Sequence, residues 1–517
     1  MDREKTVLIK EDEPTVQKGR RSLNAQFDAI GVLLNQGINL LTITSCKDTQ
    51  STGSVDVCKI IGNGLTDPES HKNRCYNNGE HVTDTESSCE SSFACSSTSS
   101  GISCCSESDE ESTSSEDDDD DDDDSDYSTS SINKRWTTKN GYNLTTFDQT
   151  ECSGKWDDEP LPLPVWSNKS KDHLVIDKLY AYEDLVAIIE TTLQHMIQET
   201  HYDTVNNFID FYDSFKKDSH SKNLREFFQL YFPPVNRQNH MCVSLGMEIV
   251  SRVALLRPDI AEYFYLVSCE EAVEDTLSYI EHCEESNIEA AAWSLEKEHA
   301  LVAMKIIVAG REGMIILDPG YHVARVVTVM KDQNYPHTGF FTQSNEPGCK
   351  REYCYTFSHN NDHFISWHER TTRNGQQKYE TSLIYVDRPY RSALDVTVRR
   401  NLVYNFRSLL SRDAKGRVFA GVYFPVLADS ADSSVTIFYD DGIDNQILKT
   451  KVKFTAFTSK IPDNIMCHLR KLAPQLRIDL SSLINILQRS ANIIADSDFV
   501  AQMLQINDVI AVLSADN

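Results

Sequence analysis

The chain has no long apolar run and few positively charged residues, and each absence excludes a class of protein. No stretch of about 20 apolar residues occurs, so a membrane-spanning helix is not expected. Lysine and arginine number 50 against 79 aspartates and glutamates, which gives the 517-residue chain a formal net charge of -29. This negative charge repels phosphate groups, so direct nucleic-acid binding is not expected either.

An apolar N-terminal segment and a paired-cysteine motif are also missing. Met1 to Lys5 is polar, which predicts a protein without a secretory signal, located in the cytoplasm or also in the nucleus. The 14 cysteines are then expected to be reduced. None forms a C-x-x-C pair in residues 46–167, and the widely spaced Cys349 and Cys354 are unlike a zinc finger. We therefore assign no metal site and no cofactor.

Residues 46–167 are rich in Ser, Thr, Asp, Glu, Gly and Asn, with an unbroken acidic run from Asp117 to Asp124. Such a segment repels itself and cannot bury enough apolar area to fold, so we expect a disordered acidic region. Serines beside the acidic run are candidate phosphorylation sites. The simplest interpretation is a solvated spacer, and the alternative is a regulatory tail that binds a basic protein. Residues 1–45 are expected to form a short, partly ordered segment.

The apolar pattern of a folded core begins near residue 168 and continues to residue 460. Helical spacing dominates its first part, whereas alternating apolar and polar residues dominate from residue 299 onward. Residues 393–410 interrupt this pattern with helical spacing, and residues 461–517 also predict helices. The expected fold class is therefore α+β, with a helical subdomain followed by a curved antiparallel sheet.

Cys242 begins a helix that is apolar on nearly every side, so this helix is expected to be central and buried. The N-terminus of a helix favours an anion, and the thiolate is the reactive form of cysteine. A lowered thiol pKa is therefore expected at this position. Taken alone, Cys242 fits a buried structural cysteine better, because free cysteine is among the most buried residue types.

His299 opens one predicted strand, and Asp318 closes the next. Residues 309–313 are typical of a tight turn, so a hairpin would bring His299 and Asp318 close together. An aspartate that orients an imidazole, whose other nitrogen takes a thiol proton, completes a Cys-His-Asp triad. The alternative interpretation is a surface histidine and a strand-end aspartate without a common role.

The order of these three residues resembles the transglutaminase-like branch of the papain-like fold, a structural group that includes the arylamine N-acetyltransferases. Residues 317–321, Leu-Asp-Pro-Gly-Tyr, are similar both to the Asp-Pro of bacterial transglutaminase-like domains and to the Asp-x-Gly-aromatic sequence of the acetyltransferases. The resemblance covers residues 175–460. Neither Gly-Gln-Cys-Trp nor Gly-Gly-x-Cys surrounds Cys242, so the oxyanion donor stays open between Gln238 and the backbone N–H of Cys242.

This resemblance implies that Cys242 attacks an acyl carbon, while His299 acts first as base and then as acid and Asp318 orients it. The implied activity is that of an acyltransferase or amide hydrolase acting on a protein or another acyl substrate. The alternative function is a catalytically inactive papain-like fold that serves as a protein-interaction module with an acidic regulatory tail. Neither a membrane nor a nucleic acid is an expected partner.

Overall fold

The computed structural model describes residues 142, 147–149, 160–285, 297–346, 348–429, 433–442 and 446–513. The expectations for residues 1–45 and for most of the acidic region lie outside these residues. The described residues form a mixed α+β fold with one nine-stranded and one five-stranded sheet, and the larger sheet is curled into an antiparallel half-barrel. The expected α+β class with a curved antiparallel sheet is thus confirmed.

The helices are α3 (Leu179–Glu199), α4 (Val205–Lys217), α5 (Leu224–Leu230), α6 (Cys242–Leu256), α7 (Thr276–Glu285), α9 (Arg399–Val403), α10 (Asp463–Gln475), α11 (Leu480–Ala495) and α12 (Ser497–Leu513). Shorter helical turns are η2 (Pro258–Tyr263), η3 (Leu394–Val398) and η5 (Phe454–Phe457). The strands are β1 (Leu174–Ile176), β2 (His201–Asp203), β3 (Tyr265–Glu270), β4 (His299–Val308), β5 (Arg311–Leu317), β6 (Val327–Met330), β7 (Phe341–Glu346), β8 (Cys349–Phe357), β9 (Phe364–Arg373), β10 (Gln376–Tyr385), β11 (Phe406–Arg412), β12 (Val418–Pro425), β13 (Ser434–Asp440) and β14 (Ile447–Lys453).

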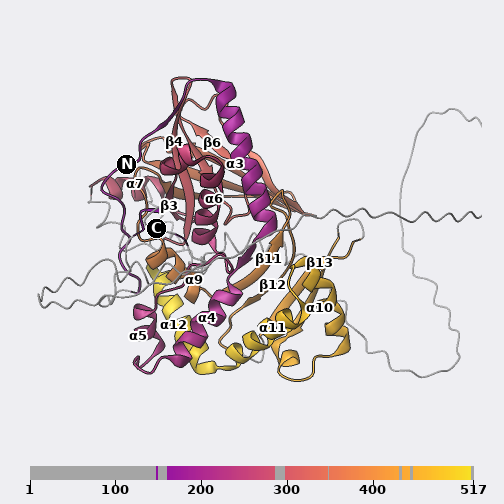
Figure 1. Ribbon diagram of the computed structural model, residues 1–517. Coiled ribbons are helices and arrows are strands. Elements are labelled where there is room, and N and C mark those ends of the chain that lie inside the picture. Colours follow the sequence, from indigo (N-terminus) through magenta and orange to yellow (C-terminus); the bar gives the residue numbers. More distant parts are fainter. Residues whose placement is uncertain are drawn as a thin grey trace, which may run out of the picture. The chain divides into compact units, whose positions relative to one another are not determined.

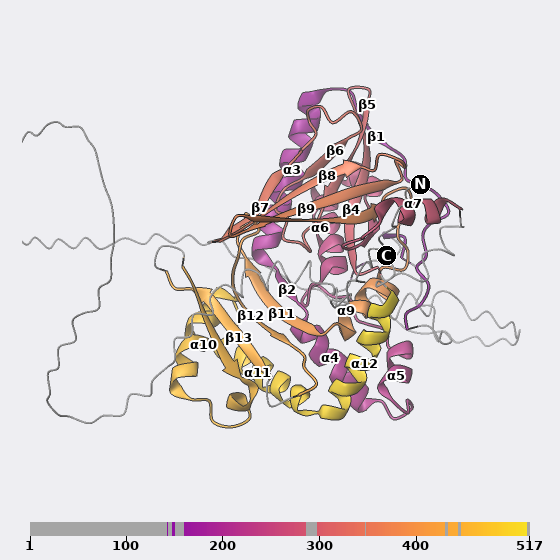
Figure 2. The same cartoon turned by 180° about the vertical axis from the view of Figure 1, so that it is seen from behind.

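The larger sheet has the strand order β6-β5-β4-β3-β10-β9-β8-β7, and β1 adds to β4 in parallel. Its curl brings β6 alongside β8, as seen from behind in Figure 2. Alternate residues therefore face two separate apolar cores. The core inside the curl is rich in aromatic rings such as Tyr353, Tyr355 and Trp367. The core on the other face packs against α3 and α6 (Figure 1).

The smaller sheet has the strand order β14-β13-β12-β11-β2 and is covered by α10 and α11 (Figure 1). Leu469 of α10 and Leu487 of α11 are fully buried and belong to the same apolar core as α3 and α6. The C-terminal helices are therefore part of one folded core with the preceding residues.

Two features differ from the sequence expectations. The packed core extends upstream of residue 168, because Tyr142 and Trp166 are each only 2% exposed. The indole Nε1 of Trp166 donates a hydrogen bond to Ser268 Oγ at 3.1 Å, which fixes this segment on β3. The helix expected over residues 393–410 ends at Val403, and β11 begins at Phe406. Pairing with β2 and β12 overrides helical spacing there, since strand preference depends mainly on neighbours.

Candidate active site

Helix α6 begins at Cys242, as its sequence predicts, and Met241 is the N-cap residue. The preceding loop is held at several points. The carboxamide oxygen of Asn236 accepts hydrogen bonds from the backbone N–H groups of Gln238 and Asn239. The backbone N–H of Asp203, in β2, donates to the carbonyl oxygen of His240 at 2.8 Å. These contacts fix the start of α6, where the first backbone N–H groups have no partner within the helix.

The β4–β5 hairpin brings His299 and Asp318 together. Its register pairs Val302 with Leu317, so the start of β4 lies beside the end of β5. Asp318 Oδ1 lies 3.0 Å from His299 Nε2, and both side chains are fully buried. The same oxygen accepts a hydrogen bond from the backbone N–H of Tyr321 at 3.1 Å. The carboxylate is thus held from two sides and orients the imidazole.

The thiol of Cys242 reaches the same imidazole. Its side chain is hydrogen-bonded to His299. Because Nε2 is engaged by Asp318, Nδ1 is the ring nitrogen that remains for the thiol. Gly320 lies against both groups, since an added Cβ there would lie 2.8 Å from His299 Cε1 and 3.0 Å from Cys242 Cβ. The structure therefore brings the three predicted residues into one hydrogen-bonded chain.

The charges around His299 favour a protonated imidazole. Burial disfavours the charged ring, but the Asp318 carboxylate and the Cys242 thiol outweigh it and raise the pKa of His299 to about 10. At neutral pH the ring therefore carries its second proton, which is the form that stabilises an adjacent thiolate. Two aromatic rings pack beside it, with centroids 4.7 Å away for Tyr321 and 6.5 Å away for Trp367.

Solvent is excluded from this group of side chains. Cys242 is 1% exposed, and His299 and Asp318 are fully buried. Cys269 of β3 is paired opposite His299 and is also fully buried, and burial raises the pKa of its thiol well above the ordinary value. Tyr202 of β2 approaches Cys242 from the other sheet, and burial with the nearby thiol raises the pKa of its hydroxyl.

Gln238 lies apart from the buried groups, because its side chain is exposed. The backbone N–H of Cys242, in contrast, is at the first position of α6. An oxyanion role for the Gln238 side chain stays a prediction. No role was predicted from the sequence for Gly320 or Tyr202. Gly320 follows the quoted Asp-Pro pair and is visible in the motif, whereas no local pattern marks Tyr202.

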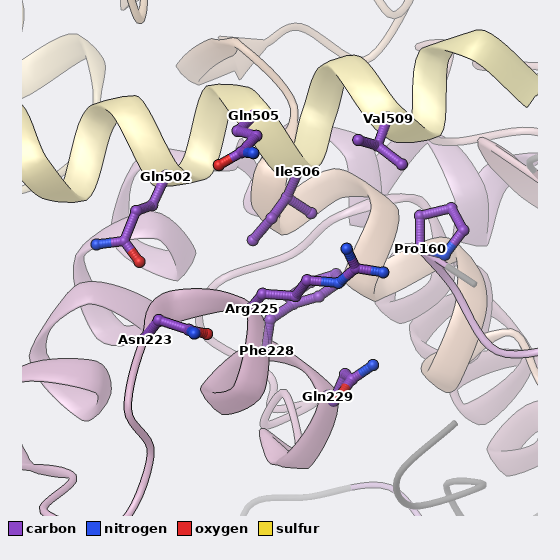
Figure 3. A pocket seen from close by; sticks show the side chains of 9 residues that line it. All are labelled: Pro160, Asn223, Arg225, Phe228, Gln229, Gln502, Gln505, Ile506 and Val509. Atoms are coloured by element: carbon purple, nitrogen blue, oxygen red, sulfur yellow. The ribbon is translucent and has the colours of Figure 1, made fainter. Parts of the chain in front are cut away.

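A cavity of about 270 Å³ lies elsewhere, between α5 and α12 (Figure 3). Side-chain amides and one guanidinium surround an apolar floor there, from Asn223, Arg225, Phe228, Gln229, Gln502 and Ile506 among others. None of its lining residues belongs to the triad, and it contains no nucleophile. We therefore place the candidate active site at Cys242, where the reactive groups converge.

Comparison with protein-family models, curated proteins and solved structures finds no match for this chain. The arrangement of the site is thus the basis for any functional assignment. Among the described residues, no helix is long and apolar enough to cross a membrane.

Proposed function

We propose that this chain is a cysteine-nucleophile enzyme that transfers or hydrolyses acyl groups, with a papain-like arrangement of the transglutaminase-like branch. The observation that carries the proposal is the hydrogen-bonded chain from the Cys242 thiol through His299 to Asp318. A helix N-terminus supplies the nucleophile, and two neighbouring strands supply the other groups. This is the arrangement that the resemblance implies.

In the proposed reaction, the thiol proton of Cys242 already resides on His299, and the thiolate sulfur attacks the acyl carbon. The backbone N–H of Cys242 stabilises the oxyanion, with Gln238 as the alternative donor. His299 then donates the proton to the leaving group as the carbon–leaving-group bond breaks, which leaves a thioester. Water or an amine attacks the thioester, His299 accepts a proton from this nucleophile, and the thiol is restored as the acyl product leaves.

Burial of the triad means that an acyl substrate reaches Cys242 only after a local opening. Exclusion of water strengthens the interactions of His299 with Asp318 and with the thiol. The same burial is the observation that favours the second candidate, an interaction module with an idle triad. The two candidates differ in whether the paired thiol reacts as a thiolate below the pH range of ordinary thiols.

The test is the rate of alkylation of each cysteine by iodoacetamide, followed by mass spectrometry from about pH 5 to about pH 9. Slow opening lowers the rate of a buried thiol at every pH, whereas thiolate formation sets the shape of the pH profile. Cys242 is expected to keep at least half of its maximal rate at about pH 6, where the exposed Cys467 reacts slowly.

His299→Ala is the matched variant, because it removes the imidazole and leaves Cys242 in place. It is expected to move the Cys242 profile to that of an ordinary thiol. A wild-type Cys242 profile no different from those of Cys269 and Cys467 would contradict the enzyme proposal and favour the interaction module. Cys269 controls for burial, since it is as inaccessible as Cys242.

A further inference from the structure

Arg412 ends β11, and its charged side chain is buried. It is fully buried, and within the described part of the chain it forms no ion pair with a carboxylate. A buried charge without a counter-ion costs several kcal/mol, whereas methionine would fill a similar volume without that cost. Packing alone therefore does not explain an arginine here.

A β-bulge aims this side chain. The pairing of β11 with β12 shifts between Ser411, which faces Ala420, and Arg412, which faces Val418. Bulges redirect side chains and are frequent beside active sites. The other edge of β11 pairs with β2, which begins one residue after Thr200 at the end of α3. Arg412 thus projects between α3 and the larger sheet.

The guanidinium bridges these two parts of the molecule. Nη1 donates to the carbonyl oxygen of Pro319 at 3.1 Å and to His322 Nδ1 at 3.4 Å. Nη2 donates to Thr200 Oγ1 at 3.0 Å and to the Thr200 carbonyl oxygen at 3.4 Å. Pro319 directly follows Asp318, so the bridge ends on the turn that carries the triad carboxylate.

That turn needs external support. His322 has a positive φ of 61°, a backbone conformation that costs about 1 kcal/mol or more in a residue other than glycine. Gly416, in the β11–β12 connection, packs so closely that an added Cβ would lie 1.9 Å from the His322 carbonyl oxygen. Burial and the adjacent Arg412 lower the pKa of His322, so its ring is neutral and Nδ1 can accept.

We propose that Arg412 is a positioning residue of the active site, which ties the Asp318–Val323 turn to the end of α3 and so holds Asp318 and Gly320 against His299 and Cys242. The proposal extends the proposed function, on which it rests. It makes the five-stranded sheet part of the active unit, because β11 supplies Arg412 and β2 places the ring of Tyr202 edge-on against His322 of the same turn.

Arg412→Met is the direct test, and Arg407→Met is its matched control. Arg407 lies on the same strand, is equally buried and donates to the carbonyl oxygens of Asn401 and Leu402 rather than to the triad turn. Two quantities are measured on the full chain: the pKa of His299 from the NMR titration of labelled histidine rings, and the pH profile of Cys242 alkylation.

Arg412→Met is expected to lower the pKa of His299 by at least one unit and to slow Cys242 alkylation at about pH 6 by about tenfold. Arg407→Met is expected to leave both quantities at their wild-type values while lowering stability to a similar degree. Wild-type values in Arg412→Met would overturn the proposal. If wild-type Cys242 has an ordinary profile, the proposed function fails, and the His299 titration alone decides the role of Arg412.

A milder pair of variants covers the case in which Arg412→Met does not fold. Thr200→Val removes the hydroxyl that accepts from Arg412, whereas Thr192→Val removes a buried hydroxyl of the same helix that donates only to the Ile188 carbonyl oxygen. Thr200→Val is expected to shift the pKa of His299 in the same direction by a smaller amount. Equal values in the two variants would overturn the proposal.

Discussion

Two buried pairs of opposite charge involve Lys297 and His299, just before and at the start of β4, and they differ in what else each basic group contacts. Lys297 pairs with Glu270, and its ammonium group also donates to Tyr279 Oη at 3.0 Å. His299, two residues later, pairs with Asp318 and also contacts Cys242. Both basic groups are almost completely shielded from solvent.

The two pairs differ in whether the basic group can transfer its proton. Burial opposes the charge on Lys297, but Glu270 outweighs it and raises the pKa further above its ordinary value, so the ammonium keeps its proton. The imidazole of His299 contacts a thiol and has a second nitrogen fixed by a carboxylate, so it can pass a proton in both directions. The Lys297–Glu270 pair therefore has a structural role alone. The His299–Asp318 pair forms a candidate active site because a nucleophile, Cys242, contacts it.

The largest expected effect comes from breaking the structural pair. Glu270→Gln leaves the Lys297 charge buried without its counter-ion and is expected to lower the free energy of unfolding by about 3–5 kcal/mol. Urea denaturation measures this change. The pH profile of Cys242 alkylation should remain that of the wild type, and a shifted profile would show that the two pairs act as one unit.

A smaller effect is expected from Gly320→Ala. The added methyl group would press on His299 and Cys242, which should lower the free energy of unfolding by about 1–3 kcal/mol. It should also lower the rate of Cys242 alkylation at about pH 6. Gly246→Ala is the control, because its methyl group would lie 3.0 Å from Leu266 Cδ2 and 3.1 Å from Val302 Cγ2, a similar crowding away from the imidazole. If both variants keep the wild-type alkylation profile, close contact at Gly320 is irrelevant to the thiol.

The pH dependence of stability separates the pairs further. The pKa of His299 is raised from 6.5 to about 10, so its contribution is fully present below pH 6.5 and is lost as the pH rises through about 10. His299→Gln should therefore flatten the decline of unfolding free energy in this range, by less than about 1.4 kcal/mol for each pH unit. Parallel declines in the variant and the wild type would contradict the assigned shift.

The smallest effect is expected at Gln238, the exposed residue among the predicted site residues. Gln238→Ala should change the free energy of unfolding by less than about 0.5 kcal/mol. Alkylation of Cys242 forms no oxyanion, so its rate should also stay unchanged. A slower alkylation in this variant would place Gln238 in control of access to the thiol rather than in an oxyanion role.

Local pattern was sufficient for the elements that carry the triad. The start of α6 at Cys242 and the hairpin from His299 to Leu317 follow from helical spacing and from a short turn. It failed over residues 406–410, where the strand partners β2 and β12 decide the conformation. It also missed the upstream residues Tyr142 and Trp166. Tyr142 is isolated in a polar segment, and Trp166 follows the alternating prolines of residues 160–165, where no helical spacing is present.

The sequence by itself determined the order of the three reactive residues, the elements on which they lie and the acidic character of the chain. Only the tertiary structure decided that thiol, imidazole and carboxylate converge, that solvent is excluded from them and that Arg412 approaches from another sheet. The physical reason is the separation along the chain of the residues that are in contact. Periodicity reports contacts within an element, whereas the bridge from Arg412 to Pro319 joins residues that only the packing of two sheets brings together.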